Sequence, residues 1–460
     1  MARFGETKTG GRPASTGVIP GRFALSVGMP ATPAPYGWRW VALSDVARLE
    51  TGHTPSRRHP EYWDGGIPWI GIKDATENHG RTIDDTHQHA SQLGIDNSSA
   101  RVLPEHTVCL SRTASVGYVV VMGKPMATSQ DFVNWVCSDA IDYRYLKYVL
   151  LGEHETFLQF ASGTTHQTIY FPEVKAFHIC LPPIAEQRAI AYTLGALDDK
   201  IELNRRMNET LEAIARALFK SWFVDFDSVR AKAEGRDPGL PKPFADLFPD
   251  SFEDSELGEI PKGWRVGTLG DVAEHPRRGI QPNKIETTTP YIALEHMPRR
   301  CIALSEWGTA DGLESNKFEF KCGEILFGKL RPYFHKVGVA PVDGVCSTDI
   351  VVVTPRAQEW FGFVLGHVSS DAFVEHTNAG STGTKMPRTS WGDMARYPIV
   401  LPPGSIAHAF TSNVRTSVAR INACIHQSRT LAALRDTLLP KLISGEVRIQ
   451  IAENLVGTAI

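Results

Sequence analysis

Two stretches of this 460-residue chain begin in almost the same way. GWRWVALSDVA occupies residues 37–47 and GWRVGTLGDVA occupies residues 263–273, with seven of the eleven positions identical. A chain of this length exceeds what one hydrophobic core usually organises. Because an internal repeat dictates the architecture more strongly than any local pattern, we predict one folding unit that occurs twice.

The repeat continues far beyond these openings. Apolar, strand-like stretches and polar loops recur in the same order in both halves. Each half closes on an LPP sequence, after which the pattern changes. The further matched pairs are IPWIGI (67–72) with TPYIAL (289–294), SQDF (129–132) with STDI (347–350), SGTTH (162–166) with TGTKM (382–386), and FHICLPP (177–183) with YPIVLPP (397–403).

After each LPP sequence, apolar residues lie three and four apart, which predicts a long helix. In the first helix, about 39 residues from Glu186 to Val224 would span roughly 58 Å at about 1.5 Å per residue. An offset of 220 residues aligns Ile201 with Ile421 and Leu211 with Leu431. We expect the helices to pair antiparallel as a coiled coil; the alternative is that each lies on its own domain. The predicted interface comprises Leu194, Leu197, Ile201, Leu211, Leu218, Val414, Ile421, Leu431 and Leu438, with Asn204 and Asn208 as polar insertions.

The fold class follows from these patterns. We predict an α+β protein with a pseudo-two-fold internal repeat, in which two tandem α/β domains are separated by two long antiparallel helices. A mobile extension is expected at the N-terminus, and Met29 is a second candidate for the start of translation. The predicted segments are the extension (1–34), the first α/β domain (35–183), the first helix (184–226), a Pro- and acid-rich linker (227–260), the second α/β domain (261–403), the second helix (404–446) and a tail (447–460).

Composition restricts the class of protein. With 42% hydrophobic and 22% charged residues, the chain is typical of soluble proteins, and we expect it in the cytoplasm, away from any membrane. The seven cysteines form no CxxC pair, so neither a zinc site nor a disulfide framework is indicated. The two α/β segments carry net charges of only -4 and +1, so binding to nucleic acid would depend on local basic patches or on partners.

The helical segments resemble a known family. IAEQRAIAYTLGALDDKIELNRRMNETLEAIARALFKSWFVDFD and TLAALRDTLLPKLISGEVRI are similar to the central and C-terminal regions of specificity subunits of type I restriction-modification systems. The two GWR openings and the loops ending in SGTTH and GSTGTKMPRTSW resemble the edges of that family's two target recognition domains. The resemblance covers roughly residues 35–450, and it departs where GSIAHAF stands in place of IAEQRAI.

The resemblance implies a non-catalytic subunit that recognises a bipartite, asymmetric target in double-stranded DNA. It implies two modification subunits as partners, which methylate adenine with S-adenosylmethionine, and further restriction subunits driven by ATP. No cofactor is expected on this chain itself, because S-adenosylmethionine, ATP and Mg²⁺ would bind to the partners. The interiors of the recognition domains vary within the family, so the DNA sequence does not follow from the resemblance.

Candidate DNA contacts lie in two kinds of position. Loops rich in Gly and Thr offer hydroxyls, amides and backbone N–H groups, although such loops can also merely turn the chain. Basic residues at strand ends can reach phosphates, although Lys73 can equally pair with Asp74 or another local acid. Arg57 and Arg58, in a Pro-bounded polar loop, rank lower. The candidates are Lys73, Arg112, Thr164, Thr165, His166, Gln167, Lys329, Arg331, Thr384, Lys385 and Arg388.

Two other classes of function are less consistent with the sequence. A stand-alone metal-dependent nuclease would need clustered acids, but Asp74, Asp131 and Asp349 have no ligand spacing. A coiled-coil scaffold without nucleic acid does not explain the paired polar loops. GEILFGKL (323–330) fits the spacing of a phosphate-binding loop but has Leu330 where Ser or Thr must hold magnesium.

Overall fold

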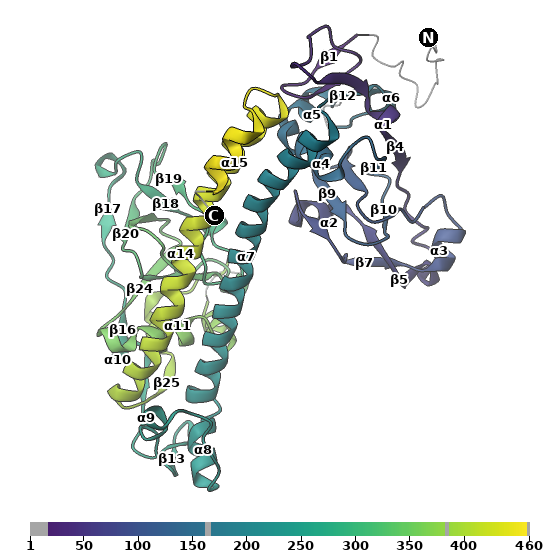
Figure 1. Cartoon of the computed structure of the whole chain (residues 1–460). Helices are drawn as coiled ribbons and strands as arrows, with labels where there is room; N and C mark the ends of the chain where they lie inside the picture. Colours follow the sequence, from purple (N-terminus) through teal and green to yellow (C-terminus); the bar gives the residue numbers. More distant parts are fainter. Residues whose placement is uncertain (1–16, 162–166, 382–385, 458–460) are drawn as a thin grey trace. The chain divides into compact units, whose positions relative to one another are not determined.

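A computed structural model describes residues 17–161, 167–381 and 386–457. The chain divides into two compact units (Figure 1). Unit 1 contains Met1–Asp199 and Leu431–Ile460, and unit 2 contains Lys200–Thr430. Each unit therefore combines one α/β domain with parts of the two long helices, α7 (Ile184–Phe223) and α14 (Gly404–Ile443). No helix among the described residues is long and apolar enough to cross a membrane.

The centre of unit 1 is a five-stranded sheet in the order β4-β11-β8-β9-β6. Strands β8 and β9 are buried along their whole length, and α4 packs against both. The elements of unit 1, besides the long helices, are β1 (Ile19–Pro20), β2 (Leu25–Val27), β3 (Arg39–Ala42), α1 (Leu43–Val46), β4 (Ala47–Thr51), η1 (Pro60–Tyr62), β5 (Trp63–Ile70), α2 (Ile72–Glu77), β6 (Thr82–Ile83), β7 (Gln88–Ala90), α3 (Gln92–Asp96), β8 (Val108–Ser111), β9 (Val119–Met122), β10 (Ala127–Thr128), β11 (Phe132–Cys137), α4 (Tyr143–Gly152), α5 (His154–Phe160), α6 (Phe171–Lys175), β12 (Phe177–Leu181) and α15 (Ile449–Gly457).

Unit 2 contains a related central sheet in the order β16-β24-β21-β22. Strand β21 pairs antiparallel with both β24 and β22, as β8 pairs with β11 and β9 in unit 1. Its elements are α8 (Asp227–Ala233), α9 (Lys242–Ala245), β13 (Phe252–Ser255), β14 (Gly258–Pro261), β15 (Arg265–Thr268), α10 (Leu269–Val272), β16 (Ala273–Glu274), β17 (Gly279–Ile280), η2 (Pro282–Lys284), β18 (Pro290–Ile292), η3 (Leu294–His296), β19 (Gly308–Thr309), β20 (Lys317–Phe320), β21 (Ile325–Gly328), η4 (Pro332–Phe334), β22 (Val337–Val339), β23 (Gly344–Cys346), β24 (Ile350–Pro355), η5 (Gln358–Trp360), α11 (Phe361–Val368), α12 (Asp371–Ala379), α13 (Trp391–Ala395) and β25 (Pro398–Leu401).

The two predicted long helices are present, and they run antiparallel. In unit 2, the Asn204 amide nitrogen donates to the Gln427 side chain at 3.0 Å and to the Ser428 hydroxyl at 3.2 Å. Further along α7, Leu211 packs with the earlier residue Ile421 of α14. The residue numbers therefore rise on one helix as they fall on the other. The α+β fold with two long antiparallel helices, expected from the sequence, is confirmed.

The predicted interface residues differ in burial. The first half of α14 also packs on the core of unit 2, where Phe410 and Val418 meet Phe219 and Phe223 of α7. The helices thus pair with each other and also lie on a domain, which combines the two arrangements considered from the sequence. Leu194, Leu197, Val414, Ile421, Leu431 and Leu438 are buried, whereas Ile201, Leu211 and Leu218 are partly exposed.

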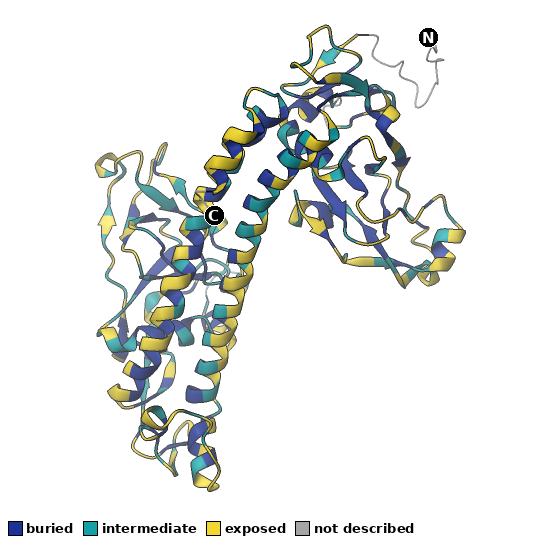
Figure 2. Ribbon diagram, in the orientation of Figure 1, coloured by how far each residue is buried: buried dark blue, intermediate teal, exposed yellow. Residues whose placement is uncertain are grey.

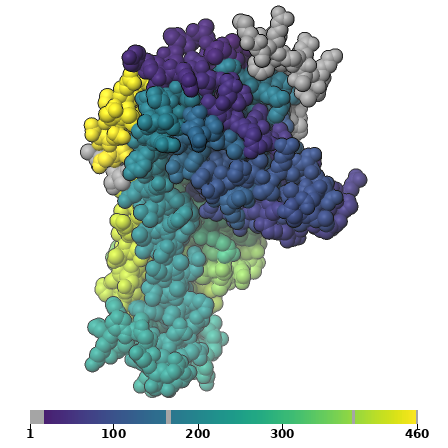
Figure 3. Space-filling view, turned by 45° about the vertical axis from the view of Figure 1, so that its right-hand side comes forward, coloured from purple at the N-terminus to yellow at the C-terminus, as the bar shows by residue number. Residues whose placement is uncertain are grey.

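The described part of the N-terminal segment is folded, which corrects our expectation of a mobile extension. Strand β2 pairs antiparallel with β12, and Leu25 and Val27 are buried. The fully buried Glu153 carboxylate accepts hydrogen bonds from the backbone N–H groups of residues 22, 23 and 24 at 2.9, 2.8 and 2.7 Å, respectively. Figure 3 shows these purple N-terminal residues against the body of unit 1. Composition misled because the acid that binds these N–H groups lies about 130 positions later in the chain.

The predicted Pro- and acid-rich linker (227–260) is also more ordered than its composition suggested. It forms α8, α9 and the hairpin β13–β14. Val229 and Phe248 are buried and join the core of unit 2 together with Trp264. Leu240, Phe244, Leu247 and Phe252 pack against the same core, whereas Leu257 is 44% exposed. Trp38 and Trp264 are buried where the two domains begin.

We predict that Glu153→Ala lowers the free energy of unfolding by about 3 kcal/mol, because several buried N–H groups lose their only charged acceptor. The matched control is Glu155→Ala, two residues along α5, since Glu155 pairs with Arg22 but is largely exposed. An exposed pair contributes about 0.5 kcal/mol. Denaturant unfolding measures both. Equal, small losses would show that the N-terminal segment is not held by Glu153.

Candidate nucleic-acid interface

The same turn follows the same strand in both units. In unit 1, β8 ends and the Arg112 N–H donates to the Asp131 carbonyl at 2.8 Å, while the Ile169 N–H donates to the Arg112 carbonyl at 2.9 Å. In unit 2, the Lys329 N–H donates to the Asp349 carbonyl at 2.9 Å, and the Thr389 N–H donates to the Lys329 carbonyl at 3.1 Å. We call residues 112–114 and 329–331 the basic turns. Their hydrogen bonds place Arg112 and Lys329 at equivalent positions.

Each basic turn is fixed by an aspartate. The Asp131 carboxylate accepts from the Thr113 hydroxyl and from the Ser129 hydroxyl, both at 3.0 Å. The Asp349 carboxylate lies 3.2 Å from Nε of Arg388. The Asp131 carboxylate therefore holds its turn directly, whereas the Asp349 carboxylate pairs with Arg388 and the backbone carbonyl of Asp349 holds Lys329. Among the residues that the structure describes, no group of three or more His, Cys, Asp or Glu residues could hold a metal ion.

The third residue of each basic turn has left-handed backbone. Ala114 has a φ of 63° and Arg331 a φ of 50°. Side chains other than glycine rarely adopt this conformation, and it persists only where surrounding bonds enforce it. The shared strain is further evidence that the two turns are copies of one structure.

The polar loops return to the basic turns. Thr164, Thr165, His166, Thr384 and Lys385 lie outside the described residues. The chain segments that follow them are bound to the turns through Ile169 and Thr389, and the Arg331 N–H donates to the Pro387 carbonyl at 2.7 Å. Gln167 and Arg388 are exposed at the loop ends. The structure therefore brings Arg112 to the loop that ends at Gln167 in unit 1, and Lys329, Arg331 and Arg388 together in unit 2.

Positive charge gathers at both turns. Burial lowers the pKa of Arg112, an effect that the nearby Asp131 carboxylate opposes, and a guanidinium remains charged at neutral pH. The Arg112 Nη2 donates to the Gln130 carbonyl at 3.2 Å. In unit 2, the pKa of His275 is lowered, first by burial and then by neighbouring cations that include Arg277 and Lys329. A lowered pKa disfavours the charged imidazolium, so the positive charge near this turn is that of the Lys and Arg side chains.

Lys73 does not belong to this shared arrangement. It lies on α2, is exposed, and is 3.9 Å from Glu77. The Asp74 carboxylate accepts from the Gly71 and His87 N–H groups, so the local acid that pairs with Lys73 is Glu77 and not Asp74. Because residues 67–72 match 289–294, the position equivalent to Lys73 in unit 2 is Glu295. A cation at this place is thus a property of one domain only.

Sequence reasoning missed an aromatic contact made by Arg57. The Arg57 guanidinium carbon lies 4.2 Å from the centroid of the Trp63 ring and 5.4 Å from that of Trp69. The two tryptophans are six residues apart in β5, and the strand has a bulge between Trp63 and Ile67. Because the bulge interrupts the alternation of side chains, no regular spacing in the sequence signals this contact. In unit 2, Arg299 lies over the Phe334 ring at 4.2 Å.

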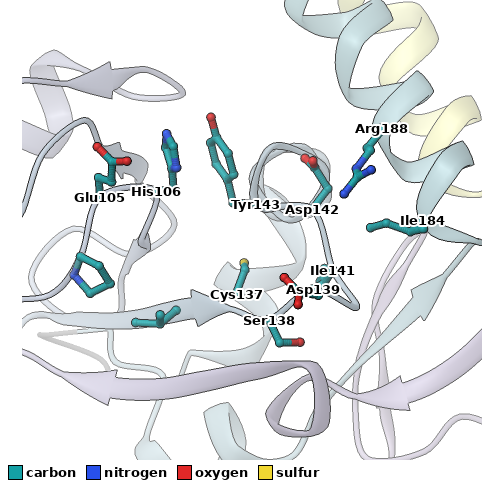
Figure 4. A pocket seen from close by; sticks show the side chains of 12 residues that line it. Glu105, His106, Cys137, Ser138, Asp139, Ile141, Asp142, Tyr143, Ile184 and Arg188 are labelled. Carbon is teal, nitrogen blue, oxygen red and sulfur yellow. The ribbon is translucent and has the colours of Figure 1, made fainter.

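An acidic cavity of about 340 Å³ lies in unit 1 (Figure 4). Glu105, Asp139 and Asp142 line it together with Arg188. The Asp142 carboxylate already caps α4, accepting from the Arg144 N–H at 2.9 Å. Since clustered carboxylates repel phosphate, this cavity does not belong to the candidate nucleic-acid interface.

Comparisons with known proteins agree on one family. The sequence model of the family described as "Type I restriction modification DNA specificity domain" matches residues 35–213. The MjaIX specificity subunit of a type I restriction enzyme from Methanocaldococcus jannaschii is 28% identical, over 90% of this chain and 95% of that protein. The EcoDI specificity subunit from Escherichia coli is 23% identical, over 92% and 91%. The crystal structure of a type I restriction-modification S subunit from M. genitalium shares the fold, with a TM-score of 0.55 at 16% identity over 88% of this chain and 96% of its own.

We predict that Arg112→Ala and Lys329→Ala each weaken DNA binding for all sequences alike. If each cation neutralises one phosphate, the slope of log binding constant against log salt concentration should fall in magnitude by about 0.9 per variant. The control is Lys321→Ala, whose ammonium group already pairs with Asp343 at 3.0 Å. Binding titrations at several salt concentrations measure the slopes. Slopes equal to those of the unsubstituted protein would exclude both residues from phosphate contact.

Proposed function

Because the chain belongs to the family of type I restriction-modification specificity subunits, we propose that it selects the DNA target of a type I complex. In this role it is not itself an enzyme, and partner subunits carry out methylation and cleavage. The target is bipartite and asymmetric, because two related but different domains each recognise one half. S-adenosylmethionine, ATP and Mg²⁺ bind to the partners, and the complex works in the cytoplasm.

One observation carries this proposal: the basic turn occurs twice on the same hydrogen-bond frame but with different residues. Arg112 is followed by Thr113 and Ala114, whereas Lys329 is followed by Leu330 and Arg331. A shared frame supports a shared task, and different side chains on it support different half-sites. In both copies the carboxylate that a nuclease would need as a metal ligand is engaged by another side chain, Thr113 for Asp131 and Arg388 for Asp349.

The surface of α7 supports docking of two modification subunits. Leu203, Met207 and Ile214 are 55%, 37% and 49% exposed (Figure 2). Their spacing of four and seven residues places them on one face of the helix, which we call the α7 stripe. An exposed apolar row on a helix that already has a partner is typical of an interface. We propose that a helix of a modification subunit packs along it.

The proposal is tested by reconstitution with the modification subunits. The chain alone should leave DNA unmodified, and the complex should methylate adenine within one bipartite motif. Leu203→Asp together with Ile214→Asp should abolish complex formation, because a partner would have to bury unpaired charges. Ala213→Asp, at an exposed position of the same helix outside the α7 stripe, is the control.

Size-exclusion chromatography with light scattering measures assembly, and sequencing that detects methylated adenine measures the product. Cleavage or methylation of DNA by the chain alone would contradict the proposed role. A fully assembled complex with the double variant would remove the α7 stripe from the docking surface.

A further inference from the structure

We propose that Arg57 recognises a guanine base within the half-site bound by unit 1. This inference rests on the proposed function and names a residue that determines its specificity. It rests on three features of the Arg57 guanidinium that the sequence did not reveal. The group stacks on an aromatic ring, a hydrogen bond holds it in its plane, and it has no acidic partner among the described residues.

The aromatic platform beneath Arg57 is rigid. Trp63 and Trp69 meet edge to face, with ring centroids 5.2 Å apart and an interplanar angle of 86°. Trp69 is buried, and its indole N–H donates to the His53 carbonyl at 3.1 Å. The stacked guanidinium therefore rests on side chains that are themselves fixed, which limits its motion perpendicular to the ring of Trp63.

A hydrogen bond fixes the remaining rotation. The Arg57 Nη2 donates to the Gln88 side-chain oxygen at 2.8 Å. Stacking sets the plane of the guanidinium, and this bond sets its direction within the plane. Arginine has five N–H donors, so the group keeps unused donors in an exposed position. Because the side chain is already ordered, little rotamer entropy remains to be lost on binding.

Arg57 lies on the same surface as the basic turn of unit 1. The His53 N–H donates to the Thr128 carbonyl at 2.9 Å, and the Thr54 hydroxyl donates to the Gln130 side chain. The Gln130 carbonyl in turn accepts from Arg112. A chain of direct contacts thus links the loop that carries Arg57 to the turn that we assign to phosphate. A base-recognising group is expected beside such a positioning contact.

The chemistry of the contact favours guanine. A phosphate needs only a nearby positive charge, which a flexible lysine or arginine supplies equally well. A guanidinium with a fixed plane matches the paired acceptors O6 and N7 of guanine in the major groove. In unit 2, Arg299 stacks on Phe334, but no side-chain hydrogen bond holds it among the described residues. Arg57 therefore has the more defined geometry.

The experiment uses the complete complex with its modification subunits and DNA carrying the methylated motif found for the unsubstituted protein. Arg57→Ala and Arg57→Lys are compared with Arg58→Ala. Arg58 is an exposed neighbour whose side chain does not take part in the contacts that hold Arg57. We expect both Arg57 variants to lose roughly 10- to 100-fold in affinity and to accept other bases at one G·C position. The other half-site should stay unchanged, and so should the binding by Arg58→Ala.

A second arm replaces that guanine by 7-deazaguanine, which lacks the N7 acceptor. This base should weaken binding by the unsubstituted complex but leave binding by Arg57→Ala unaffected. If the Arg57 variants lose the same affinity on all DNA sequences and show a smaller salt slope, Arg57 contacts a phosphate. If their specificity is unchanged, the role of Arg57 is purely structural. Either result overturns the proposal. If the unsubstituted complex neither binds nor methylates DNA, the proposed function itself fails, which is a distinct outcome.

Discussion

The structure depends on a small set of backbone hydrogen bonds that join three distant parts of each domain. The end of one strand, an aspartate directly before the neighbouring strand, and the segment that follows the polar loop meet at Arg112 in unit 1 and at Lys329 in unit 2. Backbone bonds tolerate many side chains. One frame can therefore present different residues to DNA without refolding, which is the property that two different readers in one chain require.

Each domain is also fixed to the long helices by a carboxylate on α7. In unit 1, Asp198 accepts from the Tyr148 hydroxyl at 2.7 Å and pairs with Arg435 of α14 at 2.8 Å. In unit 2, Glu212 is buried and accepts from the N–H groups of Ile302 and Ala303 at 3.1 and 3.0 Å. Charged anchors of this kind are costly to rearrange because a broken buried pair leaves an uncompensated charge. Each domain is thus attached to its part of the helix pair in one defined way.

Sequence patterns predicted the fold well wherever the signal was periodic or repeated. The duplicated openings and the heptad spacing predicted the two α/β domains and the two helices. The positions of Arg112 and Lys329 at strand ends made them candidate DNA contacts. Predictions from the sequence were incomplete where one distant residue determines the local structure. Glu153 orders a segment about 130 positions earlier in the chain, and Trp63 and Gln88 together orient Arg57. Composition cannot reveal such contacts, because they depend on which loops the fold brings together.

The central claim is that the two domains recognise their half-sites independently, although both use one duplicated frame. A domain exchange tests this claim most directly. Residues 17–183 are replaced as a block by the corresponding segment of a relative, because residues 17–34 are part of the first domain. Methylated adenines are then mapped after reconstitution with the modification subunits. The account predicts that one half of the motif changes while the other half remains. A change in both halves would contradict it.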